Sequence, residues 1–94
     1  METKELNRQE YQLRIDKVTD YIHNHIDQPL SLQKMAGIAC FSPFHFHRVF
    51  VFLTGETPTD YIKRIRIEKA ALLLKQDKEL SATEIARLCG FSSL

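Results

Sequence analysis

The chain has 94 residues, which fits one small domain, and its charged and apolar fractions of 27% and 44% are ordinary for a soluble globular protein. No apolar run approaches the roughly 20 residues needed to span a bilayer. The charged first residues lack the apolar segment of a signal peptide, so we expect a cytoplasmic protein without a membrane partner. The net charge of +1 is by itself a weak argument for a nucleic-acid partner.

The two cysteines, Cys40 and Cys89, are too few for a disulfide framework. We expect both to be small, buried apolar side chains, with redox sensing or metal binding as the lesser alternative.

The N-terminal third of the chain predicts two helices. Residues 1–9 are polar, and we expect a flexible N-terminus. Apolar residues then recur at helical spacing between Glu10 and Asp27, and the helix ends before Pro29 because the residue preceding a proline disfavours helical backbone. Ser31 is a capping residue for a short second helix that runs to Ala39.

Three further helices follow. Ser42-Pro43 predicts the start of a third helix running to Leu53, because serine caps helices and proline suits their first position. Thr57-Pro58 predicts a long fourth helix to Lys75, and Ser81 predicts a fifth from Ala82 to Cys89. Because no stretch alternates as a strand would, we expect an all-α fold.

The sequence repeats itself at an offset of 50 residues, between segments 30–42 and 80–92. Each segment reads as a cap, a short helix, a small residue, a tight turn, an apolar residue and a new cap, the pattern of a helix-turn-helix. The turn favours glycine because it requires a positive φ. Gly90 meets that requirement but Cys40 does not, so either Cys40 is strained or the first turn has another shape.

The third helix has two faces. The inner face, which we expect to pack in the core, consists of Phe46, Val49, Phe50 and Leu53. The outer face consists of Phe44, His47, Arg48 and Val51. The major groove of DNA would accommodate this mixture, with Arg48 on guanine, His47 at a base edge and Phe44 against a thymine methyl. In the alternative, which the pattern allows equally well, Phe44 and Val51 pack on neighbouring helices and Arg48 is a solvated charge.

The histidine pairs His23/His25 and His45/His47 invite a metal hypothesis. Residues two apart on a helix point in different directions, so neither pair chelates one ion from a regular helix. We therefore expect no metal and no cofactor. The sequence shows no catalytic cluster of serine, cysteine or carboxylate and no glycine-rich loop, so we do not expect an enzyme.

Taken together, these motifs resemble the DNA-binding domain of the AraC/XylS family of transcription regulators over about residues 12–94. The residues that carry the resemblance are 30–36, 41–50, 55–62, 64–70 and 85–93. The resemblance implies two helix-turn-helix units joined by a long helix. It divides this chain into a first unit at 10–56, a linking helix at 57–75 and an incomplete second unit at 76–94, after the flexible residues 1–9.

The resemblance also implies a binding site. Phe44, His47 and Arg48 stand at the family's base-contacting positions, and Ser42 stands where a phosphate contact is expected. Arg66 matches a recurrent arginine that we interpret as structural. Val51 departs from the pattern because the family often has a basic residue there.

The implied function is sequence-specific recognition of double-stranded DNA by a bacterial transcription regulator, more often an activator. The resemblance admits RNA polymerase and, through a further domain of the GyrI-like type, a small-molecule effector as partners of a longer protein. The alternative is a helix-turn-helix module that binds other proteins and not DNA.

The family's domain continues beyond the position of Leu94, so the chain resembles a form truncated within the second helix-turn-helix. On that basis we expect an exposed apolar patch around Ile85, Leu88 and Phe91, and self-association through it.

Overall fold

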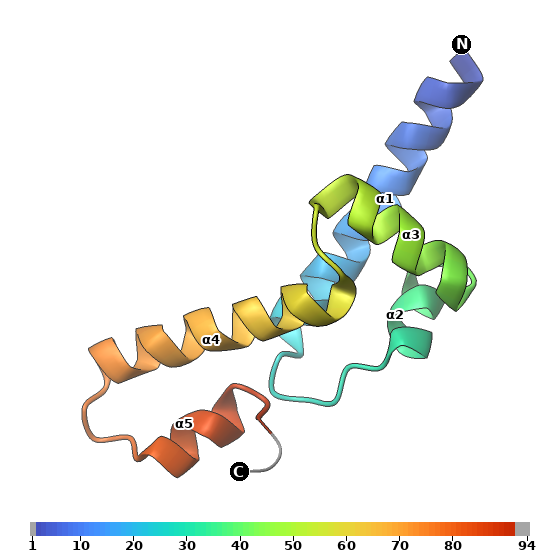
Figure 1. Cartoon of the computed structure of the whole chain (residues 1–94). Helices are drawn as coiled ribbons and strands as arrows, with labels where there is room; N and C mark the ends of the chain where they lie inside the picture. The colour runs from blue at the N-terminus through green and yellow to red at the C-terminus, as the bar shows by residue number, and fades with distance from the viewer. Residues whose placement is uncertain (1, 92–94) are drawn as a thin grey trace.

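The computed structural model describes residues 2–91, with side chains from Asn7 onward, and these residues form helices and connecting turns without a strand (Figure 1). The expected all-α fold is therefore confirmed for the described residues. The molecule is elongated, with extents of 55 × 23 × 18 Å. Its helices are α1 (Glu2–Asn24), α2 (Leu32–Ala39), α3 (Pro43–Thr54), α4 (Pro58–Gln76) and α5 (Ala82–Leu88).

Each helix from α2 to α5 begins at a predicted hydroxyl cap. The side chains of these caps accept a hydrogen bond from the backbone N–H three residues further on, at 3.1–3.2 Å, which satisfies one of the free N–H groups of the first turn. The caps are Ser31, Ser42, Thr57 and Ser81. The helix starts expected from the sequence are thus confirmed.

The first helix differs from the expectation at both ends. It begins at Glu2, so the expected start of the helix at Glu10 was wrong. Residues 2–9 include glutamate, lysine, leucine, glutamine and arginine, which favour helix in the absence of packing. The helix ends at Asn24, and Ile26, although 4% exposed, belongs to the following turn. Because Ile26 is apolar and buried, it continued the helical spacing of apolar residues beyond the end of the helix, and the predicted end at Asp27 was therefore too late.

The core lies where α1, α2, α3 and the start of α4 meet. It is built from the apolar side that each helix presents, and its largest fully buried side chains include Phe46 and Phe50 of α3. The predicted inner face of α3 is confirmed for Phe46, Val49 and Phe50, whereas Leu53 is half-buried at its edge. The other buried members are Ile15, Val18, Ile22, Ile26, Met35, Ala36, Ala39, Ile62 and Ile65.

The two repeated segments fold into the same turn. The N–H of Phe41 donates to the carbonyl of Ala36, and the N–H of Phe91 donates to that of Ala86, both at 2.9 Å. Such a bond, reaching back five residues, closes a helix when the residue before the donor is left-handed. Cys40 has φ 60° and Gly90 has φ 86°, so both turns meet this requirement.

Cys40 resolves the question left open by the sequence, because it adopts the left-handed conformation that glycine would adopt without strain. It is also exposed, so the prediction that both cysteines are buried was wrong for Cys40. A residue at the apex of a surface turn has no core to enter. Cys89 is buried as expected, and this burial raises the pKa of its thiol.

Long-range hydrogen bonds hold α4 and α5 in place. The guanidinium of Arg66 donates to the carbonyls of Ile26 at 3.3 Å and Gln28 at 3.0 Å, and the ammonium of Lys69 donates to the carbonyl of Leu88 at 3.0 Å. Arg66 therefore has the structural position that we expected. The backbone of Gly90 approaches the same groups so closely that only glycine fits. A β-carbon there would overlap the Ile26 carbonyl and stand 2.7 Å from Arg66 Nε.

The apolar patch expected around α5 differs from the observed surface. Ile85 is 4% exposed and Leu88 and Phe91 are half-buried, because α5 folds back onto α4. The exposed apolar side chains of this region lie on α4 instead, namely Ile67, Leu72 and Leu74.

Within the described residues, no single helix is both long and apolar enough to cross a membrane. The bent pair of α2 and α3 passes the same test by length and composition alone, and its apolar residues are largely those of the core.

We predict that Cys40→Gly stabilises the protein. A left-handed non-glycine residue costs about 1–2 kcal/mol, and the greater freedom of glycine in the unfolded chain offsets part of the gain. The free energy of unfolding in urea should therefore rise by about 0.5–1 kcal/mol. Cys40→Ala is the matched control, because it removes the thiol and retains the β-carbon. Equal stability of the two variants would contradict a backbone origin.

Candidate nucleic-acid interface

The outer face of α3 is open to solvent. Phe44 is 75% exposed, and Ser42, His47 and Arg48 are also exposed. The structure thus brings the four predicted site residues together at the first turns of one helix. Val51 is half-buried. The alternative in which Phe44 packs on a neighbouring helix does not agree with its exposure.

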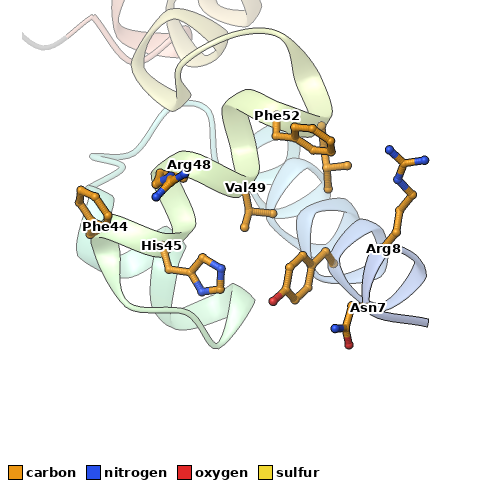
Figure 2. A pocket seen from close by; sticks show the side chains of 9 residues that line it. Asn7, Arg8, Phe44, His45, Arg48, Val49 and Phe52 are labelled. Carbon is orange, nitrogen blue, oxygen red and sulfur yellow. The ribbon is translucent and has the colours of Figure 1, made fainter. Parts of the chain in front are cut away.

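Arg48 and Phe44 form a pair on this face. They lie one turn apart, and the guanidinium carbon of Arg48 is 5.9 Å from the centre of the Phe44 ring (Figure 2). At this distance the ring attracts the cation, and the contact occupies none of the N–H groups of the guanidinium with a hydrogen bond. Arg48 makes no ion pair with any carboxylate described in the structure. The pair therefore presents a planar donor beside an apolar ring.

Ser42 has two roles available at the start of α3. Its Oγ accepts a hydrogen bond from the N–H of His45 at 3.2 Å, and its own hydroxyl hydrogen can donate to another group. The first turn of α3 contains no acidic residue. The partial positive charge of the helix N-terminus is therefore not neutralised by its own first turn.

The four histidines lie in different environments. His45 packs against Tyr11 and Phe41, with ring centres 5.6 and 4.8 Å apart. His23 lies 3.1 Å from the hydroxyl of Tyr61, and His25 stacks on Tyr21. His47 is therefore the histidine that the outer face of α3 presents.

An open groove separates α3 from the N-terminal part of α1. It has a volume of about 820 Å³, and Figure 2 shows it between Arg8 on one side and Phe52 and Arg48 on the other. Phe52 is 72% exposed, and the guanidinium carbon of Arg8 is 5.8 Å from the centre of its ring. The sequence interpretation missed both residues. Residues 1–9 were expected to be flexible, and Phe52 was not assigned to either of the two predicted faces of α3. The helix-favouring composition of residues 2–9 was the available indication.

An ion cluster fixes the linking helix to the end of α3. Arg64 donates to Glu56 at 2.8 Å and to Glu68 at 2.9 Å. The hydrogen bond from Arg64 lowers the pKa of Glu56, and both carboxylates raise the pKa of Arg64. Tyr61 lies beside this cluster, and its pKa is raised mainly by burial. The start of α4 is thus held against both α1 and α3.

Comparison with known proteins gives consistent matches. The family model described as "Helix-turn-helix domain" matches residues 35–94. The bifunctional transcriptional activator/DNA repair enzyme AdaA of Bacillus subtilis (strain 168) is 36% identical over 62 residues, covering 66% of this chain and 29% of AdaA. The HTH-type transcriptional activator RhaS of Enterobacter sp. (strain 638) is 33% identical over 78 residues, covering 83% of this chain and 28% of RhaS.

A solved structure is also similar. The DNA-binding domain of AdpA, described as the global transcriptional factor and crystallised with a target DNA, matches with a TM-score of 0.77 and 29% identity. The match covers 83% of this chain and 69% of that one. The chain spans less than a third of the length of AdaA or RhaS.

The cap at Ser42 gives a test of how α3 is held. Ser42→Ala should lower the free energy of unfolding by about 1 kcal/mol, because the N–H of His45 loses its acceptor. Ser42→Asp should retain the stability, since aspartate also caps and favours the helix N-terminus. Urea unfolding followed by circular dichroism measures both. An alanine variant as stable as the wild type would show that the cap does not stabilise α3.

Proposed function

Since the chain belongs to the AraC-type helix-turn-helix family, we propose that it is the sequence-specific DNA-binding domain of a transcription regulator, with α3 as a recognition helix. The observation that carries this proposal is the exposure of Phe44 beside Arg48 on the open face of α3. A phenylalanine that is 75% exposed contributes little to folding, whereas it suits a surface that contacts base edges.

Each residue of the open face has a proposed role. Arg48 donates to O6 and N7 of guanine, and Phe44 contacts a thymine methyl. His47 exchanges a hydrogen bond with a base edge. Ser42 donates its hydroxyl to a phosphate at the N-terminus of α3, where the helix dipole favours an anion.

The linking helix suits a two-part DNA site. α4 has 19 residues, and at about 1.5 Å per residue it is roughly 28 Å long. Successive major grooves on one face of DNA lie about 34 Å apart. A rod of this length, held at one end by α1 and carrying α5 at the other, is compatible with a second helix-turn-helix near the next groove.

For the whole regulator we propose a cytoplasmic location and activation of transcription. It would act with RNA polymerase and take a small-molecule effector through another domain. The repair activity in the name of AdaA belongs to a protein of which this chain covers 29%, and we propose no catalytic role for the chain itself.

Selection from a randomised duplex library tests the proposal directly. The full chain should retain duplexes that converge on one sequence over successive rounds, and binding should weaken steeply with salt. Binding without convergence would contradict sequence specificity. No binding at low salt would instead favour the protein-interaction alternative, with which the net charge of +1 is compatible.

Arg48 provides a test of base recognition. Arg48→Ala should weaken binding to the selected duplex by about 1–3 kcal/mol and relax the preference at one base pair. Arg48→Lys is the matched control, because lysine keeps the charge and loses the planar pair of donors. Fluorescence anisotropy on the selected duplex and its single-base variants measures both. An equal loss on every duplex would make Arg48 a phosphate contact.

A further inference from the structure

We propose that Arg8 of α1 binds a DNA backbone phosphate beside the major groove, with Phe52 of α3 as the apolar surface on which its guanidinium rests. This inference depends on the proposed function, since it requires α3 to lie in the groove. It adds a second helix, α1, to the DNA-binding surface. This addition cannot be inferred from the face pattern of α3 alone.

The position of Arg8 follows from the length of α1. The helix continues past α3 toward the N-terminus (Figure 1), and its residues Asn7 and Arg8 line the groove together with residues of α3. The guanidinium of Arg8 lies 5.8 Å from the centre of the Phe52 ring, so the cation stands beside the recognition helix and not away from it. The turns of α1 that precede Tyr11 therefore supply this cation to the flank of α3.

Phe52 and Phe44 of α3 each lie close to an arginine in a similar way. Each ring is more than 70% exposed and each has a guanidinium within 6 Å of its centre, supplied by Arg8 in one case and Arg48 in the other. The two phenylalanines are eight residues apart, about 12 Å along the helix axis. Because contact with a ring face uses none of the N–H groups of a guanidinium, both arginines keep donors for phosphate at the groove that they line.

The charge of α3 explains why a second helix is needed. Arg48 is the only lysine or arginine between Pro43 and Thr54. A duplex carries two phosphate backbones that flank the groove, and binding depends on cations that reach them. The nearby carboxylate of Glu10 pairs with Arg14 at 2.7 Å, so it is engaged by another cation.

The shape and chemistry of the groove fit a sugar-phosphate strand. Its walls are aromatic and aliphatic where Phe52, Leu53 and Tyr11 line it, and its cations stand at opposite sides. A deoxyribose has apolar faces and each phosphate carries one negative charge, so an open groove with this lining complements the backbone of DNA. An acidic peptide would satisfy the cations as well, and the experiment below separates the two.

The salt dependence of binding tests the role of Arg8. The dissociation constant of the selected duplex is measured by anisotropy over a series of salt concentrations for the wild type and for Arg8→Ala. The variant should bind several-fold more weakly at low salt, and the slope of log affinity against log salt should fall by about 0.9, the value for one phosphate contact. The loss should be equal on the selected duplex and on its single-base variants.

Two controls make the result specific. Lys17→Ala removes the same charge from the opposite side of α1, because nine residues are about two and a half turns, and it should leave the slope unchanged. Arg8→Lys retains the charge and should keep most of the slope. Circular dichroism checks that each variant keeps its helix content.

The outcomes separate this inference from the proposed function. If the wild type selects a duplex and Arg8→Ala has the wild-type slope, the phosphate contact is refuted and the recognition helix stands. If Lys17→Ala lowers the slope as much as Arg8→Ala, the slope reports the total charge of the protein and not a contact at Arg8, and the inference also fails. The same anisotropy assay is run with a labelled oligoglutamate peptide. If the wild type binds no duplex but binds this peptide, and Arg8→Ala weakens that binding, the groove serves a protein partner and both proposals fail.

Discussion

The burial of Phe46 and Phe50 determines what the rest of the domain can present. Both rings are fully buried among α1, α2 and α4, and each contributes about 1.5–3 kcal/mol by leaving water. A helix with a period of 3.6 residues cannot bury these positions without turning residues 44 and 48 outward. The open face is therefore a consequence of core packing, and a rotation of α3 about its axis would expose both rings to solvent.

Helix α1 supports this arrangement from two sides. Its middle turns contribute Ile15, Val18 and Ile22 to the core, so they hold the inner face of α3. Its first turns run beyond the core and line the groove with Asn7 and Arg8. One continuous helix thus connects the packing that fixes α3 with the polar groups at its flank.

Much of the fold was predictable because it depends on local chemistry. Hydroxyl caps and prolines fix the helix starts within a few residues, so Ser42-Pro43 and Thr57-Pro58 were sufficient to place α3 and α4. The division of α3 into two faces needed only its period. Some errors were local, namely the two ends of α1 and the burial of Cys40, and the others concern contacts between distant segments. The return of α5 onto α4, which buries Ile85, and the approach of Arg8 to Phe52 leave no local pattern. The side-chain roles on α3 remain proposals.

The close approach at Gly90 has a consequence for how the two motifs move. The backbone there touches the carbonyl of Ile26 and the guanidinium of Arg66, so the turn of the second motif rests on the turn that follows α1. Neither motif can pivot about α4 without breaking these contacts. The two motifs are accordingly joined by direct contacts as well as through α4. On the proposed two-part DNA site, added or deleted base pairs between the two parts would therefore have to be accommodated by bending or twisting of the DNA or by loss of these contacts.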